Sequence, residues 1–151
     1  MTSNVIHIEF KNKKHFPPGE WLREPDVCKW ESNGFQCLAI REKQMGVWTA
    51  FVGVSKEHSS FSKPLKILLH EPWFLNLNVH GGVSTIGKNS LDKDLWWFGW
   101  DTSQGEDLMP LVQFDPDDPI LGQYHINHTY KNLKFVIKET NLLAKQLLKI
   151  K

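Results

Sequence analysis

The sequence predicts a single α+β domain over residues 1–151, in which a mainly antiparallel, twisted sheet packs against a long C-terminal helix. Two patterns predict this fold class. Several short segments between residues 4 and 101 alternate apolar and polar side chains, which is the period of a strand. Residues 130–151 instead repeat apolar side chains every 3.6 residues or so, which is typical of an amphipathic helix. A chain of 151 residues without internal repeats has the length of one domain with one core.

The N-terminal segment is predicted to form the first strand. Residues 4–10 alternate in polarity, and this period places the side chains of Ile6, Ile8 and Phe10 on the buried face. The following segment is basic and then rich in proline, so we expect a loop with one short helical turn near residues 19–23.

Residues 26–55 are predicted to form a three-stranded meander. Asn33-Gly34 is a strong signal for a tight hairpin turn, and a second turn falls at residues 43–46. The strand between these turns has apolar side chains on both faces, which indicates a place in the middle of the sheet. Gly53 in the third strand indicates a bulge or a close approach by another group.

The middle of the chain is less regular. Pro64 is expected to open a short helix or an edge strand. Residues 73–79 alternate and predict a strand that runs into a turn at Gly81-Gly82, with residues 83–87 as a continuation past a bulge. A polar loop at 88–94 then leads into a strand at 95–101.

The C-terminal third is predicted to be a loop followed by the helix. Residues 102–124 have no period and contain Gly, Pro and acidic residues, so we expect a surface loop that covers the functional site. The helix over 130–151 has Thr129 as its expected N-cap, and its apolar stripe should pack across the sheet.

Composition excludes several classes of protein. A formal net charge of +1 makes nucleic acid an unlikely partner, and no apolar run approaches the roughly 20 residues that cross a bilayer, so no membrane association is expected. The N-terminus lacks the apolar core of a signal peptide, which predicts a cytoplasmic protein. Cys28 and Cys37 are therefore expected to be reduced, although a disulfide across a hairpin is left open.

The turn His80-Gly81-Gly82 is the first candidate for a binding site. Two glycines allow the backbone to adopt positive φ and to approach a ligand closely, and successive N–H groups there can hold an anion. The imidazole could donate to a phosphate or act as an acid or base near neutral pH. The alternative is a tight turn with a surface histidine.

The segment 96–101, WWFGWD, is the second candidate, and Trp is unusually frequent in the chain, with seven copies. Strand alternation places Trp97 and Asp101 on one face, where an indole beside a carboxylate could stack on a nucleobase and bind its edge. We assign the other face, which carries Trp96, Phe98 and Trp100, to the core; the alternative is that all the rings are core. A buried Asp101 would need a partner such as Thr102, Ser103 or His80.

Other motifs argue against a metal or a cofactor. His125 and His128 have a spacing seen in some metal pairs, but no zinc pattern accompanies them, and we predict neither metal nor cofactor. Nothing resembles a phosphate loop, a nucleophile elbow or a dinucleotide fingerprint. His80 with Asp101 could support acid–base chemistry, but no activated nucleophile is evident.

Four segments in order, GVWTAFVGV, VHGGVST, WWFGWD and TYKNLKFVIKETNLLAKQL, resemble a family of small bacteriophage and prophage proteins with the patterns GYVGVP, DVHGGLTY, WWFGFDCAHxGD and YRDLEYVKxECxxLAEQL. The resemblance covers residues 46–148 and implies a phage accessory protein, a class that often antagonises host defence. It also implies a set of site residues, namely His58, His80, Gly81, Gly82, Trp97, Asp101, Asp107 and Tyr130.

The chain departs from that pattern after Asp101, where Thr102-Ser103-Gln104 replaces Cys-Ala-His. Gln104 cannot act as an acid or base but can still hydrogen-bond a ligand, which favours a binding protein over an enzyme. We therefore expect an anti-defence protein in the host cytoplasm that sequesters a small nucleotide-like signalling molecule. The expected ligand-binding residues are His58, His80, Gly81, Gly82, Trp97, Asp101, Gln104 and Tyr130, with no catalytic residue.

Two alternatives remain open from the sequence. One is a hydrolase or cyclase that acts on such a nucleotide through His80 and Asp101. The other is a protein–protein inhibitor of a host defence enzyme, acting through the acidic segment with Asp115, Asp117 and Asp118 or through the basic final helix. A homo-oligomer, with a site shared between copies, is compatible with each hypothesis.

Overall fold

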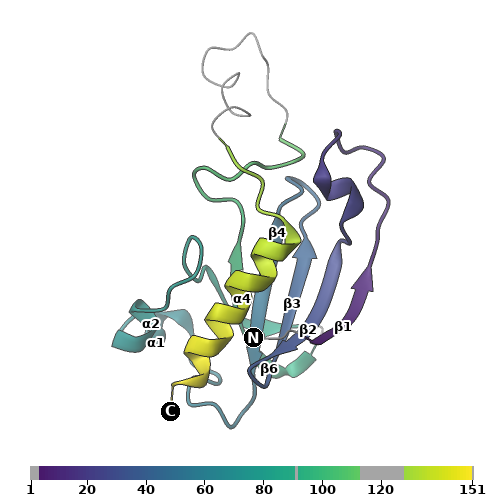
Figure 1. The fold of residues 1–151 in the computed structure, drawn as a ribbon. Coiled ribbons are helices and arrows are strands. Elements are labelled where there is room, and N and C mark those ends of the chain that lie inside the picture. Colours follow the sequence, from purple (N-terminus) through teal and green to yellow (C-terminus); the bar gives the residue numbers. More distant parts are fainter. Residues whose placement is uncertain (1–3, 91, 113–127, 151) are drawn as a thin grey trace.

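The computed structural model describes residues 4–90, 92–112 and 128–150. Its centre is a six-stranded sheet in the order β1-β2-β3-β4-β6-β5, with antiparallel pairing throughout. The helix α4 lies across one face of this sheet (Figure 1). The predicted α+β fold is therefore confirmed. The elements are β1 (Asn4–Glu9), η1 (Glu20–Arg23), β2 (Val27–Ser32), β3 (Phe35–Arg41), β4 (Trp48–Val54), α1 (Leu65–Leu68), α2 (Pro72–Leu75), β5 (Thr85–Asn89), β6 (Asp92–Asp101) and α4 (Leu133–Leu148).

The meander formed by β2, β3 and β4 agrees with the prediction. Asn33 and Gly34 have φ values of 54° and 82°, which are the left-handed conformations that a two-residue hairpin turn requires. β3 and β4 occupy the centre of the sheet, as the apolar character of the β3 strand predicts. Gly53 marks a close approach, because a Cβ atom there would lie 2.9 Å from Leu95 and 3.0 Å from the ring of Trp97.

The helix α4 begins three residues later than the predicted helix. Asn132, and not Thr129, is the N-cap, because the Asn132 side chain accepts a hydrogen bond of 2.9 Å from the Phe135 amide. Two polar pairs attach the buried stripe of the helix to the sheet. Trp30 Nε1 donates to Asn141 Oδ1 at 2.8 Å, and Trp100 Nε1 donates to Thr140 Oγ1 at 3.0 Å.

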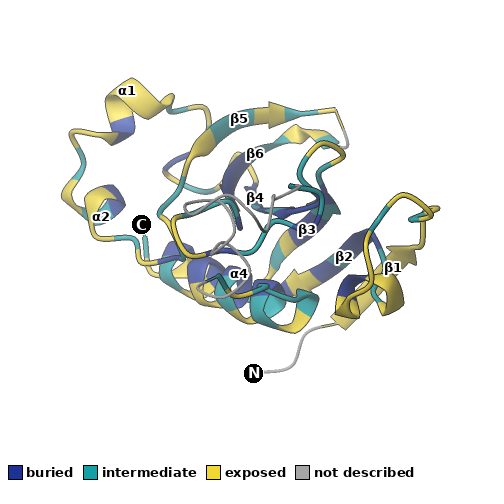
Figure 2. Cartoon of the chain, turned by 90° about the horizontal axis from the view of Figure 1, so that it is seen from above, coloured by how far each residue is buried: buried dark blue, intermediate teal, exposed yellow. Residues whose placement is uncertain are grey.

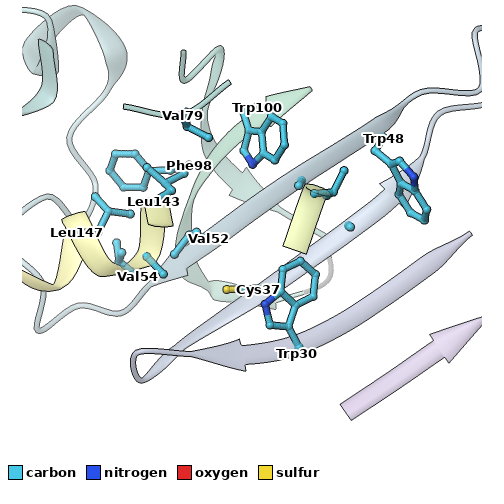
Figure 3. Packing of buried hydrophobic residues seen from close by; sticks show 14 of the residues in the cluster. Trp30, Cys37, Trp48, Val52, Val54, Val79, Phe98, Trp100, Leu143 and Leu147 are labelled. Carbon is cyan, nitrogen blue, oxygen red and sulfur yellow. The ribbon is translucent and has the colours of Figure 1, made fainter. Parts of the chain in front are cut away.

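The main core lies between α4 and the sheet, where the buried residues of both layers meet (Figure 3). Trp30, Trp48 and Trp100 are fully buried there, each with 0% exposure. Burying such large rings supplies much of the apolar area that stabilises the fold. A smaller cluster of Val27, Leu38 and Trp97 occupies the opposite face of the sheet.

The segment predicted as a strand at 73–79 is instead the helical turn α2 followed by a turn residue and irregular chain. Pro72 occupies the first helical turn, and the amide of Asn76 bonds to the Pro72 carbonyl at 3.1 Å. Phe74 and Val79 are buried in the main core, whereas Leu75 is 62% exposed. The alternation therefore reflects a one-sided helical turn and not a pleated strand.

The polar loop predicted at 88–94 is shorter than expected. β6 already begins at Asp92 and forms a hairpin with β5, in which Thr85 pairs with Gly99 and Asn89 with Asp92. The residues after the glycine turn thus form an edge strand. Pro64, for which a helix or a strand was expected, precedes the short helix α1.

The strand β1 has the predicted secondary structure but not the predicted burial. Ile6 and Ile8 of β1 are 64% and 47% exposed, and Phe10, directly after the strand, is 62% exposed, because β1 is an edge strand (Figure 2). A register shift between Val5 and His7 also interrupts the alternation of faces.

Cys28 and Cys37 are buried free thiols. They are not cross-strand neighbours, since Cys28 pairs with Ala39 and Cys37 with Trp30. Within the described residues, no helix is long and apolar enough to cross a membrane.

Candidate functional site

The candidate site is built around His80, which follows the buried Val79 and precedes the glycine turn. Its ring packs edge-on against Phe135 of α4, at a centroid distance of 5.3 Å, and against Trp100 of β6, at 6.0 Å. Nε2 lies 2.7 Å from Asp107 Oδ2, and since a carboxylate only accepts, Nε2 carries the proton. The backbone N–H of His80 donates to Glu139 Oε1 at 2.9 Å. The ring is therefore fixed in position while its side chain stays 23% exposed.

Asp107 is the buried centre of the site, with a side chain that is 1% exposed. Besides His80, it accepts the Gln104 backbone N–H at Oδ2, at 3.0 Å, and its Oδ1 lies 3.0 Å from Lys131 Nζ. Burial opposes ionisation of this carboxyl, but these three donors outweigh burial and lower the pKa of Asp107 below its ordinary value. Asp107 is thus a buried carboxylate that orients one imidazole and one ammonium group.

Backbone pairing brings Asp107 and Lys131 together. The segments around Asp107 and Thr129 form an isolated parallel bridge, in which Leu108 N–H donates to Thr129 O and Thr129 N–H donates to Glu106 O, both at 2.8 Å. Thr129, which was predicted to be the helix cap, thus joins the segment before α4 to the loop that contains Asp107.

The glycine turn forms the rim of the site. Gly81 and Gly82 have φ values of 70° and 80°. A Cβ atom on Gly81 would lie 2.3 Å from Gln104 Cγ, so the two residues are in close contact. Gln104 Nε2 donates to Asp101 Oδ1 at 3.0 Å, and the same oxygen accepts from the backbone N–H and the hydroxyl of Ser103. The structure therefore brings together Gly81, Gln104 and Asp101, next to His80 in the chain.

Sequence reasoning did not identify two parts of this arrangement. The carboxylate partner of His80 is Asp107 and not Asp101, because Asp101 bonds to Ser103 and Gln104 at the end of β6. Lys131 was not singled out at all. One sequence signal was available for Asp107, its place in the resemblance motif, but no local pattern distinguishes Lys131 from the other lysines of the basic C-terminal segment.

Trp97 does not share this site. It alternates with Trp100 along β6 and lies on the opposite face of the sheet, where it is 4% exposed and packs with Val27 and Leu38. Its Nε1 donates to the Asp92 carbonyl at 3.3 Å. The prediction that Trp97 and His80 form facing walls is wrong, because His80 packs on the face that α4 covers.

Tyr130 belongs to a different polar cluster, although it precedes Lys131. Its hydroxyl donates to Glu24 and accepts from Arg41 Nη1 at 3.0 Å and from Trp48 Nε1 at 3.2 Å. These three bonds use the full hydrogen-bonding capacity of a phenol. Burial, opposed by the charge of Arg41 and reinforced by Glu24, raises the pKa of Tyr130 above its ordinary value. The hydroxyl of Tyr130 is thus structural.

Arg41 and Asp26 form the charged centre of that second cluster. Arg41 Nε donates to Asp26 Oδ1 at 2.7 Å, and Lys13 Nζ lies 2.6 Å from Asp26 Oδ2. Burial opposes ionisation of Asp26, but bonds from Lys13, from the Lys11 backbone and from Arg41 lower its pKa. These ion pairs attach the segment after β1 to β3.

His58 is a structural histidine. Its Nε2 lies 2.7 Å from the Leu147 carbonyl, so Nε2–H donates to the C-terminal turn of α4. Its Nδ1 accepts the Ser60 amide at 3.1 Å and contacts the Ser60 hydroxyl at 2.6 Å. Both ring nitrogens are therefore used within the fold, and His58 is not close to His80 in this network.

The chemistry of the site follows from its donors. No hydroxyl or thiol of residues 4–90, 92–112 and 128–150 hydrogen-bonds His80, so the described residues place no nucleophile on this imidazole. The same ranges contain no group of three or more His, Cys, Asp or Glu side chains placed to hold a metal. His125, Asp115, Asp117 and Asp118 lie outside the described residues. The described side chains suit recognition of an anion or a polar group by an imidazole and an ammonium.

Comparison with protein-family models, with characterised protein sequences and with solved structures finds no match to this chain.

Proposed function

We propose that this protein is a phage accessory protein that sequesters a small, anionic, nucleotide-like signalling molecule of host defence in the host cytoplasm. The binding residues are His80 and Lys131, with the backbone at Gly81-Gly82. One observation carries the proposal: a single buried carboxylate, Asp107, fixes both a partly exposed imidazole and a partly exposed ammonium beside a glycine turn. The phage context rests on the motif resemblance.

The hydrogen-bond donors of the site support an anionic ligand. Asp107 holds the Nε2–H of His80, so a second proton on the ring would place a donor at Nδ1. Lys131 Nζ contacts Asp107 at 3.0 Å and the Thr129 carbonyl at 3.2 Å, and an ammonium group has three protons to donate. The imidazole and the ammonium group thus bring N–H donors to the site, beside the carboxylates of Asp107 and Glu139.

The rim supports binding without catalysis. Gln104 is held between Gly81 and Asp101 and can offer only an amide to a ligand. Preorganised polar groups of this kind reduce the ordering that a ligand must impose, which favours tight binding.

The proposal is tested by calorimetry on the intact protein with a panel of cyclic nucleotides and ADP-ribose derivatives. Lys131→Met should weaken binding of the recognised ligand at least tenfold, because it removes the ammonium but keeps the aliphatic stem. Lys134→Met is the matched control, since Lys134 is exposed in the first turn of α4, three residues after Lys131. Equal affinities of the two variants would contradict the assignment of Lys131.

Hydrolysis or cyclisation of the same ligand is the second candidate function, and one observation favours it. Asp107 binds Nε2 of His80 and leaves Nδ1 to activate a water molecule. In this case chromatography would show a product, and His80→Gln and Asp107→Asn would each abolish its formation while the protein remains folded. Recovery of unchanged ligand after long incubation with wild-type protein would exclude the enzyme.

A further inference from the structure

The edge strand β1 presents an apolar surface in the monomer. Val5, Ile6, Ile8 and Phe10 are between 47% and 64% exposed, and every residue of β1 is exposed. Figure 2 shows this strand at the margin of the sheet, exposed along its length. An edge strand also directs alternate backbone N–H and C=O groups away from the sheet, where they can pair with another strand. The monomer thus leaves the apolar side chains of β1 uncovered.

The pairing of β1 with β2 determines which side chains share a face. Ile8 pairs with Cys28, which belongs to the main core, so Ile8 lies on the face that α4 covers. His7 pairs with Lys29 and Glu9 with Val27, so His7 and Glu9 lie on the opposite face. That face also has a hollow of about 230 Å³ beside Ile6, lined in part by Leu38 and Trp97.

We propose that two copies of the chain associate by antiparallel pairing of their β1 strands, which joins the two sheets into one. A twofold axis perpendicular to the sheet preserves its faces, so each β1 residue must pair with a residue of the same face in the second copy. This requirement allows only registers in which one β1 residue lies on the axis and faces the same residue of the second copy. These registers differ in which charged side chains they place opposite each other.

The register centred on Ile8 is the complementary one. It places Ile8 opposite Ile8 of the second copy and His7 opposite Glu9 of the second copy, twice by symmetry. A register centred on Glu9 would instead oppose two carboxylates, and like charges directly opposite are destabilising. His7 and Glu9 already approach within 3.6 Å along the strand, so both copies carry the imidazole and the carboxylate on the same face. Self-association through Ile8 therefore brings two exposed apolar side chains together, avoids opposing like charges and pairs the free backbone groups of the edge.

Sedimentation of the full-length protein over a range of concentrations tests the proposal. Wild-type protein should form a dimer, and Ile8→Lys should lower the association constant at least tenfold because two lysines would face each other across the axis. Leu148→Lys is the matched control, since Leu148 is 55% exposed on α4 and should leave the dimer intact. A monomeric wild type, or an Ile8→Lys protein that dimerises as well as wild type, would overturn the proposal.

Two further variants test the register. His7→Glu should weaken the dimer, and adding Glu9→Lys to it should restore the dimer by pairing the new charges in the opposite sense. Ile8→Cys should form a symmetric disulfide under mild oxidation, because directly paired residues lie within the distance that a disulfide spans. Both cysteine variants are made in a Cys28→Ala background, because Cys28 pairs directly with Ile8 within the monomer and would compete for the disulfide. Leu148→Cys should not crosslink. If His7→Glu/Glu9→Lys did not restore the dimer and Ile8→Cys did not crosslink, this register would be excluded.

Discussion

At the scale of single residues, Gly81 and Gly82 share a left-handed backbone conformation but differ in surroundings. Space is open around Gly82, whereas a Cβ atom on Gly81 would lie 2.3 Å from Gln104 Cγ. Each alanine substitution should cost about 1–2 kcal/mol from the backbone alone. Gly81→Ala should cost more than Gly82→Ala in chemical denaturation, because Gln104 must also move away from Asp101. Equal losses would show that Gln104 is not tightly held.

The same contact gives a double-mutant test. Gln104→Ala removes the atoms that a Cβ on Gly81 would meet. In that background the excess cost of Gly81→Ala over Gly82→Ala should vanish, since the two residues would no longer be coupled. If Gly81→Ala still cost more than Gly82→Ala in the Gln104→Ala background, a group other than Gln104 would be the one that a Cβ on Gly81 meets.

The residue scale also shows why only part of the site was predictable. His80, the two glycines and Asp101 have local signals in the sequence, namely a turn and a strand end. The contacts of Asp107 and Lys131 depend on a bridge between segments that are separated in sequence, and no local pattern encodes that bridge. Trp97 was assigned correctly to the face opposite Trp100. The face on which His80 packs depends on tertiary contacts, so it does not follow from the sequence pattern.

At the scale of elements, the Asp26 cluster attaches the segment after β1 to β3. Asp26→Asn leaves buried Lys13 without its carboxylate and leaves Arg41 with Glu24 alone, which should cost about 3–5 kcal/mol at neutral pH. The folded-state pKa of Asp26 is lowered, so its stabilisation is present above the unfolded value and is lost as pH falls through the folded value.

The expected result is a pH-dependent difference between wild type and Asp26→Asn. Denaturation midpoints should differ most near pH 7 and converge below roughly pH 4, where the carboxyl of the unfolded chain is protonated. A difference that stays constant down to pH 2 would mean that the ion pairs do not account for the effect.

The attachment of α4 to the sheet offers another test. Thr140→Val removes the acceptor of the buried Trp100 indole N–H and should cost about 1–3 kcal/mol. Lys138→Ala, at an exposed position of the same helix, should change the free energy of unfolding by less than about 0.5 kcal/mol. Equilibrium denaturation followed by tryptophan fluorescence measures both values. A neutral Thr140→Val would mean that the indole finds another acceptor.

Elements with a strong local period were the predictable part of the fold. The meander and α4 follow from turn residues and from long apolar stripes. The segment 73–79 was mistaken for a strand because its apolar and polar residues alternate along the sequence. In the structure it begins with a single helical turn at Pro72 and contains no strand. The burial of β1 was predicted wrongly. An alternation of apolar and polar residues shows which side chains share a face, but not whether another element covers that face.

At the scale of the whole molecule, the proposed dimer edge and the ligand site are separate. β1 forms one margin of the sheet, whereas His80 packs on β6 and α4, with β2, β3 and β4 between β1 and β6. Ile8→Lys should therefore weaken dimerisation at least tenfold and leave the ligand affinity within about twofold of wild type, which corresponds to about 0.4 kcal/mol. Parallel loss of affinity would show that the partner copy completes the site.

The central claim is that the His80–Asp107–Lys131 site binds a nucleotide-like ligand and does not alter it. The most direct measurement titrates the folded wild-type protein with the nucleotide panel by calorimetry, then denatures the saturated complex and identifies the released molecule by mass. The expected result is saturable binding of a panel member by wild-type protein, at least tenfold weaker binding by Lys131→Met, and recovery of the ligand with its original mass. Absence of binding across the panel by a folded protein, or recovery of a converted product, would contradict the claim.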